Sequence, residues 1–522
     1  MIAGAPQPEL SDRRRLFILA ICCVSLFVVG MDSTIVNVAL PTIQQDLHAG
    51  ISGLQWTIDA YALVLGSLLI LAGSMADRFG RRLVFQAGPA VFTAGSVLCS
   101  LAPSVDWLIA FRMIQGIGGS MLNPVALSII SNVFTDEKAR ARAIGVWAGV
   151  FGLSMALGPV IGGLLIGASL GWRSVFWINL PIGLAALALV VCFVPESSAP
   201  RPRRIDPVGQ VLVIATLVTL TYAIIQGPQS GWSSAPILAC FVLSATALVA
   251  LVVYEPRQVE PLIDLRNFAS VPFSGATAIA LAAFAAIGGF ALVNTLYLQE
   301  VRGYSALHAG LLTLPVAAAT LIAGPLSGRL VARRGPRLSL LASGLALALS
   351  AVLLTGLTAS TSIGLLLASY AVFGLGFGLV SAPVNTTALA GMPRTQAGVA
   401  AAIVSTSRQV GQALGVAVAG SVIASNLHGP LRTGLAAASH PSWWVTAGYG
   451  AAVVVLALVI TSAWARRTAA ATAHLYAEGT QNPGSPDYPP GTTATQQFGT
   501  SPVTRAGSRL AGGSQTELPI RG

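Results

Sequence analysis

The segment GSMADRFGRR (Gly73 to Arg82) returns in the second half of the chain as GRLVARRGPR (Gly328 to Arg337). Aligned without gaps, the two segments share two glycines and two arginines at matching positions. Each segment follows the second apolar run of a block of six such runs, provided that two runs between the blocks are an insertion. The repeat predicts two related halves, an arrangement in which a site forms between the halves and opens alternately to either side. Coincidence between two basic loops is the alternative.

The composition indicates a membrane protein. Of the 522 residues, 54% are hydrophobic and 9% are charged, whereas an ordinary soluble protein carries roughly 25% charged residues. Apolar runs of about 20 residues have the length of a helix that crosses the hydrocarbon core of a bilayer. The net charge of +11 comes from short basic clusters between these runs, which argues against a nucleic-acid partner. The composition excludes a soluble enzyme.

Fourteen membrane helices are expected in this all-α integral membrane protein, one for each apolar run. The predicted spans are Leu16 to Leu40, Leu54 to Met75, Leu83 to Leu101, Trp107 to Ile130, Ala143 to Ile166, Val175 to Val194, Val208 to Ile225, Ile237 to Tyr254, Val271 to Leu298, Ala306 to Leu326, Leu338 to Leu357, Ile363 to Leu389, Val399 to Ala424 and Trp444 to Ala465. The predicted organisation is an N-terminal segment (1–15), a six-helix half (16–194), two inserted helices with linkers (195–270), a second six-helix half (271–465) and a tail (466–522).

Basic residues predict the orientation of the spans. Twenty-one Lys and Arg residues lie in one set of alternating loops, and three lie in the other set. Because short cytoplasmic loops are enriched in basic residues, both termini are expected to be cytoplasmic. The tail is rich in Gly, Pro, Ser, Thr and Gln, with too few apolar residues to form a core. We therefore expect the tail to be disordered.

Few ionisable residues lie inside the spans, where each one is costly and is retained mostly for function or for pairing. At about 1.5 Å per residue, Asp32, Asp59 and Arg112 fall in the outer half of the bilayer. A carboxyl group in this setting suits proton coupling or cation recognition. A permanent buried ion pair, for instance Asp59 with Arg112, is the alternative. Arg408 lies nearer the midplane, where it either lines a cavity and binds an anion or satisfies carbonyl groups at a helix end.

Small residues mark two helix faces. Arg112, Gln115, Gly116 and Gly119 recur at helical spacing, so one face of the fourth span carries the arginine and is otherwise polar or small. The fifth span ends in GPVIGG (Gly158 to Gly163), in which the proline bends the helix and the glycines allow close approach. This end is either a tight packing surface or a pliable segment that controls leakage through a central cavity.

Five segments together resemble signature motifs of the major facilitator superfamily, and more narrowly of its fourteen-span drug:proton antiporter branch. They are MDSTIVNVALP (Met31 to Pro41), GSMADRFGRR, LIAFRMIQGIGGS (Leu108 to Ser120), LGPVIGG (Leu157 to Gly163) and WRSVFWINLPIG (Trp172 to Gly183). The likeness extends over Leu16 to Ala465. It implies the major facilitator fold, with two six-helix halves plus two inserted helices.

The resemblance also implies roles for individual residues. Asp32 and Asp59 would take part in proton coupling or cation recognition, and Arg112 would assist proton movement. Asp77, Arg78 and Arg81 would lock the cytoplasmic face in the outward-open state, with the arginines pairing across the halves. The implied cytoplasmic gate comprises Gly73, Asp77, Arg78, Gly80 and Arg81; the antiporter helix carries Gly158, Pro159, Gly162 and Gly163; Gln115 and Arg408 are candidates for the cavity lining.

This chain departs from the family pattern at two positions. Ser154 stands where the antiporter motif usually carries a glycine, which weakens the assignment to export. Ala332 occupies the place in the second loop that Asp77 occupies in the first, so only the first loop is expected to form the lock. No acidic residue occurs in spans ten to fourteen. The expected substrates are therefore neutral, monocationic or zwitterionic lipophiles rather than dications.

The leading expectation is a proton-coupled antiporter that exports lipophilic drugs or antibiotics by alternating access. A dedicated exporter of a single endogenous metabolite and an uptake symporter are the alternatives. The sequence contains no nucleotide-binding loop, metal-spaced cluster or nucleophile motif, so we expect no enzymatic activity, no metal and no cofactor, with the proton gradient as energy source. A monomer in a bacterial plasma membrane is expected, with a small lipophilic substrate, protons and the lipid bilayer as its partners.

Overall fold

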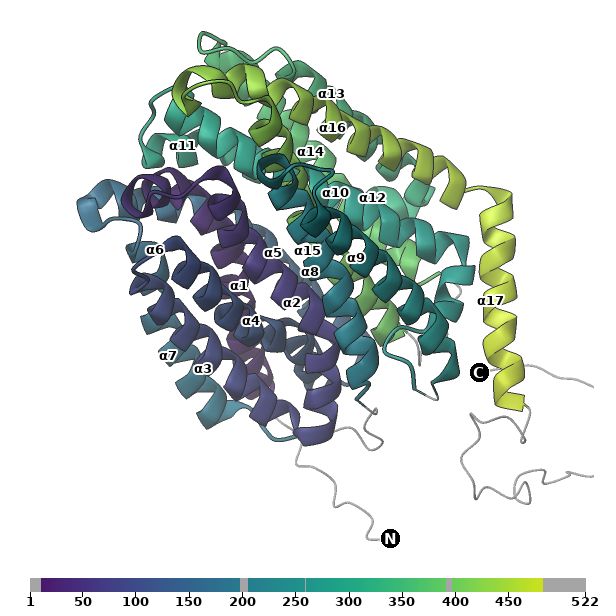
Figure 1. Ribbon diagram of the computed structural model, residues 1–522. Helices are drawn as coiled ribbons and strands as arrows, with labels where there is room; N and C mark the ends of the chain where they lie inside the picture. Colours follow the sequence, from purple (N-terminus) through teal and green to yellow (C-terminus); the bar gives the residue numbers. More distant parts are fainter. Residues whose placement is uncertain (1–10, 198–204, 259, 391–396, 482–522) are drawn as a thin grey trace, which may run out of the picture.

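The computed structural model describes residues 11–197, 205–258, 260–390 and 397–481, which form helices and connecting loops without a β-strand among them (Figure 1). The helices are, in chain order, α1 (Asp12–Leu47), α2 (Ile51–Phe79), α3 (Arg81–Ser100), α4 (Val105–Val133), α5 (Glu137–Leu165), α6 (Ser174–Trp177), α7 (Asn179–Phe193), α8 (Pro207–Ser230), α9 (Ala235–Tyr254), α10 (Val271–Leu296), α11 (Ala306–Leu312), α12 (Leu314–Arg334), α13 (Pro336–Leu354), α14 (Ile363–Ala388), α15 (Ala397–Asn426), α16 (Leu431–Ile460) and α17 (Ala463–Gln481). Two π-helical turns, η1 (Ile166–Leu170) and η4 (Tyr297–Val301), follow α5 and α10, and two 3-10 turns, η2 (Glu255–Arg257) and η3 (Leu265–Ala269), precede α10.

Twelve helices in the described part of the chain are long and apolar enough to cross a membrane. The prediction of an all-α integral membrane protein is therefore confirmed. The predicted fifth and thirteenth spans correspond to α5 and α15, which are helical but are not among those twelve. The count of fourteen spans stays a prediction.

The two repeated loop segments end their helices in the same way. After α2, Gly80 has a φ of +106°, and after α12, Gly335 has a φ of +75°. Residues with a side chain rarely adopt such a backbone conformation, whereas glycine does so at little cost. The second glycine that the segments share therefore has a structural reason: it makes the sharp turn into the next helix.

The helices pack in two groups, α1–α7 and α10–α16, with α8 and α9 between them in the chain (Figure 1). In the first group α1 packs against α5 and α2 against α4, and in the second group α10 packs against α15 and α12 against α14. These are the corresponding pairs of the repeat. The groups meet along two seams, α2 with α15 and α5 with α11 and α12. Because α8 contacts both α2 and α15, it covers the first seam.

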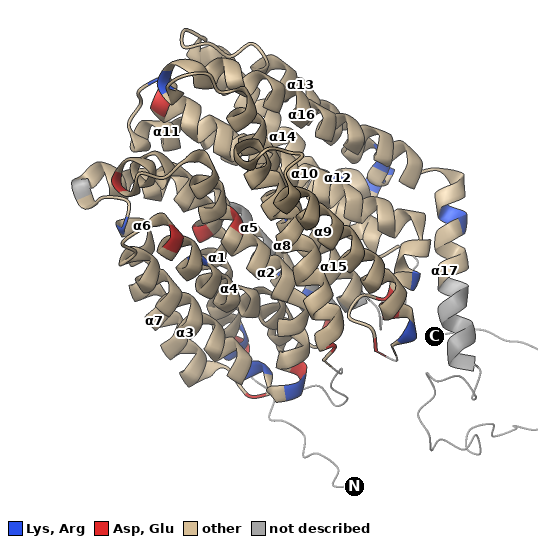
Figure 2. Cartoon of the chain, in the orientation of Figure 1, with Lys and Arg blue, Asp and Glu red and all other residues tan. Residues whose placement is uncertain are grey.

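Most Lys and Arg residues lie along the lower edge of the view in Figure 2, at the end of the bundle where α1 begins. We call this the basic end, and the opposite end the far end. Among the described residues, the hydrogen bonds between the groups lie toward the far end. Gln55 Nε2 donates to Ala417 O (2.8 Å), and Gln299 Nε2 donates to Val38 O (2.9 Å). The two groups are thus closed against each other at the far end.

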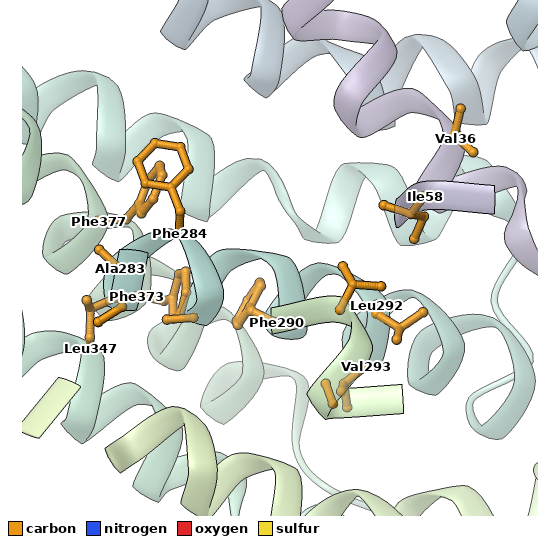
Figure 3. Close-up of a cluster of buried hydrophobic side chains, with 14 of the residues drawn as sticks. Val36, Ile58, Ala283, Phe284, Phe290, Leu292, Val293, Leu347, Phe373 and Phe377 are labelled. Carbon is orange, nitrogen blue, oxygen red and sulfur yellow. The ribbon is translucent and has the colours of Figure 1, made fainter. Parts of the chain in front are cut away.

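The apolar core is continuous across the groups. Figure 3 shows Phe284, Phe290 and Phe373 lying along α10 and α14, within one cluster of buried side chains that also includes Val36 and Ile58 of the first group. The Phe290 and Phe373 rings are stacked with their centroids 4.1 Å apart. Aromatic rings therefore pack directly against one another in the interior of the second group.

The beginning of the tail is helical, so the prediction of disorder is wrong for residues 466–481. Helix α17 covers this stretch, and its first turns are anchored because Val271 N donates to Thr468 Oγ1 (3.1 Å). The run ARRTAAATAHLYA is rich in alanine, which has the highest intrinsic helix propensity and outweighs the low hydrophobicity here. Residues 482–522 lie outside the described residues.

Candidate functional site

A buried network of polar side chains surrounds Asp32 in the middle of α1. Asp32 is fully buried, and its Oδ2 accepts a hydrogen bond from Arg112 Nη1 of α4 (2.6 Å). Its Oδ1 accepts from Gln115 Nε2 (2.8 Å) and from Asn179 Nδ2 at the start of α7 (3.1 Å). Two other helices, α4 and α7, thus direct three donors at one carboxylate, and these bonds replace the hydration that the group loses on burial.

The guanidinium of Arg112 has further partners besides Asp32. Its Nε donates to Thr57 O of α2 (3.1 Å), and its Nη1 also donates to Gln115 Oε1 (2.7 Å). The Tyr61 ring lies beneath the guanidinium, with 4.2 Å from the arginine Cζ to the ring centroid. The close approach of α2 and α4 that brings these groups together requires Gly116, because a Cβ there would lie 2.9 Å from Tyr61 O. In the described conformation Arg112 and Asp32 thus form a buried ion pair.

The example of a buried ion pair that was given as the alternative, Asp59 with Arg112, is wrong. Arg112 pairs instead with Asp32. Counting residues along a helix gives depth in the membrane but not the direction in which a side chain points, and all three residues lie at similar depths. The pairing therefore depends on helix rotation, which the sequence did not reveal.

Asp59 is also fully buried, but neither of its carboxylate oxygens has a hydrogen-bond partner in the described structure. It lies one helical turn from Gln55, which bonds to α15, and seven residues before Gly66, which packs against Gln409 of α15. Helical spacing therefore places Asp59 on the face of α2 that forms the first seam. The structure brings Asp32, Arg112 and Gln115 together and leaves Asp59 at the seam.

Asn179 and Ser96 belong to the network but were missed by the sequence analysis. Asn179 Nδ2 donates to Ser96 Oγ (3.0 Å), and Ser96 Oγ donates to Phe176 O (3.0 Å). These bonds tie the start of α7 to α3 and fix the amide of Asn179 against Asp32. The available signal was an amide side chain inside the apolar motif WRSVFWINLPIG, a position where polar groups are rarely retained without a partner.

The predicted cytoplasmic gate forms contacts within the first group. Arg81 Nη2 donates to Asp77 Oδ1 (3.0 Å), and Arg82 N donates to Glu196 Oε1 (3.2 Å). Gly73 faces Pro124 of α4, and Gly80 makes the turn described above. No ion pair from Arg78 or Arg81 to the second group occurs among the described residues. The expected pairing across the halves is therefore not made in this conformation, in which the groups meet at the far end.

The glycines of the predicted antiporter helix form tight contacts. A Cβ at Gly158 would overlap the Thr34 hydroxyl of α1, and a Cβ at Gly162 would lie 2.8 Å from Ile35 Cγ1. Gly163 faces the backbone of α11, where a Cβ would lie 2.7 Å from Leu307 Cα. A Cβ at Gly310 of α11 would in turn overlap the carbonyl of Pro159. This end of α5 is thus a tight packing surface that closes the second seam.

The two candidates for the cavity lining differ in their surroundings. Gln115 is fully buried in the Asp32 network, so in this conformation it does not line a cavity. Arg408 is only partly buried in α15. Its Nη2 donates to Asn385 Oδ1 of α14 (2.6 Å), and its Cζ lies 5.7 Å from the Phe284 ring centroid.

Two related helical groups that meet along seams, with a buried ion-pair network in one of them, are typical of membrane transport proteins whose halves rock against each other. The sequence model described as Major Facilitator Superfamily matches residues 22–416, and the chain belongs to this family.

Curated relatives cover most of the chain. "Multidrug resistance protein Stp" of Mycobacterium tuberculosis is 38% identical over 420 residues, which is 80% of this chain and 78% of the relative. "Tetracenomycin C resistance and export protein" of Streptomyces glaucescens is 37% identical over 428 residues, 82% of this chain and 79% of the relative. "Multidrug efflux pump LfrA" of Mycolicibacterium smegmatis is 33% identical over 422 residues, which is 81% of this chain and 83% of the relative.

A solved structure shares the fold. The bacterial homologue of the human lysosomal transporter Spinster, in an inward-facing and occupied conformation, superposes with a TM-score of 0.60 at 18% identity. The match covers 90% of this chain and 98% of that protein. The resemblance to the major facilitator superfamily drawn from the motifs is therefore confirmed.

Proposed function

We propose that this protein exports lipophilic drugs or antibiotics from the cell in exchange for protons. The names of the relatives support export of drugs, since they are described as multidrug resistance and efflux proteins. The observation that carries the coupling is the Asp32–Arg112 pair, in which one carboxylate holds three donors from two other helices. A proton taken up by this carboxylate removes its charge and frees those donors.

The proposed cycle uses both carboxyl groups. Protonation of Asp32 weakens its hydrogen bonds to the donors of α4 and α7. The packing of α1 against these two helices therefore becomes looser. Asp59 lies at the first seam without a hydrogen-bond partner, so it fits the closed seam best when it carries a proton. Loss of that proton places a charge between α2 and α15 and favours separation of the far end. Each group thus links a proton to one arrangement of the halves.

The orientation follows from the basic end. Positive charge accumulates on the cytoplasmic side of membrane proteins, so the basic end and both termini are placed in the cytoplasm. The far-end closure then corresponds to a conformation that receives substrate from the cytoplasm or inner leaflet. We place the protein as a monomer in a bacterial plasma membrane, with the proton gradient as its energy source and without a cofactor.

Export of one endogenous compound is the second candidate. It is favoured by the relative named as a tetracenomycin C resistance and export protein, at 37% identity. The mechanism would be the same, and the difference lies in the breadth of substrates accepted.

Reconstitution in liposomes tests the proposal. With an imposed pH gradient and a pH-sensitive dye trapped inside, we expect lipophilic cations and zwitterions to evoke proton movement that a protonophore abolishes. Activity with many chemical scaffolds supports a multidrug exporter, and activity with a single scaffold supports a dedicated one. Proton-independent transport of the same compounds would contradict antiport.

A further inference from the structure

Arg408 is a cation inside the second group that pairs with no carboxylate in the described part of the chain. Within the described residues its guanidinium has no acidic group within ion-pair distance, and its recorded hydrogen bond goes to the neutral amide of Asn385. Arg112 in the first group is instead fully buried and pairs with Asp32 at 2.6 Å. A charged group inside the membrane without a counter-charge is costly, so its retention indicates a use.

The surroundings of Arg408 combine a charged end and an apolar end. Asn385, an exposed residue of α14, lies on the side of the basic end. Phe284 and Phe377 lie on the other side, deeper along α10 and α14, with their ring centroids 5.1 Å apart. The guanidinium of Arg408 therefore lies between the exposed amide of Asn385 and the Phe284 and Phe377 rings. The Arg408 side chain is itself partly exposed.

Arg408 lies next to the seam between the two halves. Its chain neighbour Gln409 packs against Gly66 of α2 in the first seam. From this seam toward the basic end, no hydrogen bond joins the two groups in the described part of the chain. Arg408 thus lies where the halves begin to diverge, on the side from which the proposed substrate enters.

We propose that Arg408 is the recognition residue for an anionic group on the substrate, and that the subsite formed by Arg408, Asn385, Phe284 and Phe377 takes lipophilic aromatic carboxylates, zwitterions included. The planar guanidinium presents paired N–H donors that match a carboxylate. Asn385 orients the guanidinium, and the phenylalanine rings receive the aromatic body of the ligand. This inference deepens the proposed export function and rests on it.

The same chemistry accounts for the expected exclusion of dicationic substrates. The described residues of the second group place no carboxylate near this subsite, so a second positive charge on a ligand would meet Arg408 without compensation. A zwitterion instead offers its carboxylate to Arg408 and its cation to the first group, where Asp59 lies unpaired at the seam. In this proposal the second half accepts the negative charge of the substrate and the first half accepts its positive charge.

Two matched dyes test the assignment. Rhodamine 110 carries a free carboxylate, and rhodamine 123 is its methyl ester, so the pair differs in the group that Arg408 would bind. Fluorescence polarisation with the purified full-length protein gives the dissociation constant of each dye. We expect the wild type to bind the free acid at least as tightly as the ester, and Arg408→Gln to weaken the free acid by about tenfold, the size of one charge-assisted hydrogen bond.

The controls separate recognition from folding. Arg408→Gln should leave the affinity for the ester within about twofold, which shows that the fold is intact, and Arg408→Lys should restore part of the affinity for the acid because the charge remains. Arg329→Gln removes an exposed arginine of the same half and should change neither dye. If Arg408→Gln lost affinity equally for both dyes, Arg408 would have a structural role. If the affinities for both dyes were unchanged, the Arg408 side chain would only extend to the membrane surface. Either result overturns the proposal.

The binding assay keeps this inference distinct from the proposed function. If the purified protein discriminates the dyes through Arg408 but moves neither in liposomes under a pH gradient, the subsite stands and drug export by proton exchange fails. If liposomes transport both dyes with equal dependence on Arg408, export stands and the carboxylate subsite fails. A wild type that binds no free acid overturns the subsite as well.

Discussion

The two halves of this transporter share a scaffold but differ in chemistry at the same place. The motif GIG (Gly116–Gly118) of α4 and the motif GLG (Gly374–Gly376) of α14 pack alike: the first glycine of each faces α2 or α12, and the last faces α3 or α13. The offset that superimposes these motifs places Tyr370 at the position of Arg112. Tyr370 OH donates to Asn294 Oδ1 of α10 (2.6 Å), so a neutral hydrogen bond replaces the charged pair.

The difference assigns separate tasks to the halves. In the first half, α1, α4 and α7 are held together by a carboxylate that a proton can neutralise. In the second half, α10 and α14 are held by a neutral bond beside stacked aromatic rings, which no proton will release at physiological pH. We therefore propose that proton coupling belongs to the first half, whereas the second half supplies packing and Arg408, which pairs with no carboxylate among the described residues.

The largest effect is expected from Asp32→Asn. The amide keeps the shape of the side chain but leaves Arg112 without a counter-charge, at a cost of about 3 kcal/mol, and it cannot take up a proton. Gradient-driven export should fall to background while the variant still folds, as size-exclusion chromatography will show. Retained uphill transport by a folded Asp32→Asn protein would remove Asp32 from the coupling role.

Gly163→Ala should disturb the contact that the halves share. The new methyl group would meet Leu307 Cα and the carbonyl of Ala306, which are backbone atoms and cannot move aside, at a cost of about 1–3 kcal/mol. We expect the far end to open, which accessibility labelling of a cysteine placed in α11 will report. Gly145→Ala is the matched control, because a Cβ there meets nothing within 4 Å. Equal labelling of both variants would contradict the tight seam.

Gln55→Leu and Gln299→Leu should have similar, smaller effects. Gln299→Leu removes the bond to Val38 O, and Gln55→Leu removes the bond to Ala417 O together with the longer one to Val416 O (3.4 Å), a loss of about 1 kcal/mol in each case. The ratio of closed to open far ends should shift by about fivefold in either variant, and the same labelling assay measures it. A large effect in one variant and none in the other would show that one side of the closure dominates.

Tyr370→Phe should have the smallest effect and sharpens the comparison of the halves. Loss of its bond to Asn294 should lower stability by about 1 kcal/mol or less, measured as a decrease of the melting temperature in detergent. The number of protons exchanged per substrate should not change. A change in that number would show that the second half also carries a coupling step.

Much of the fold was predictable from hydropathy, because a membrane helix needs a long apolar run and little else. The repeated loop predicted two related halves. The helical spacing of Arg112 and Gln115 predicted a polar face on α4. The partner of Arg112 was not predictable, since helix rotation depends on contacts such as that of Gly116 with Tyr61 O. Asn179 was missed because its role depends on α7 reaching α1, which sequence spacing does not show.

The roles implied for the gate and for Asp59 remain predictions. Asp77 and Arg81 pair locally in the described conformation, so a lock between the halves is expected only in an arrangement with the basic end closed. Asp77→Asn is expected to change the balance between inward and outward accessibility without affecting the Asp32 network.

Proton release on substrate binding is the most direct test of the claim that coupling belongs to the first half. Purified protein in weakly buffered detergent solution, with a pH indicator and rhodamine 123 as ligand, should release protons on binding in the wild type and in Tyr370→Phe. Asp59 is the carboxyl group that carries a proton in the proposed cytoplasm-facing state, so Asp59→Asn should release none at ligand concentrations that saturate it. Equal proton release by Asp59→Asn and the wild type would contradict the account.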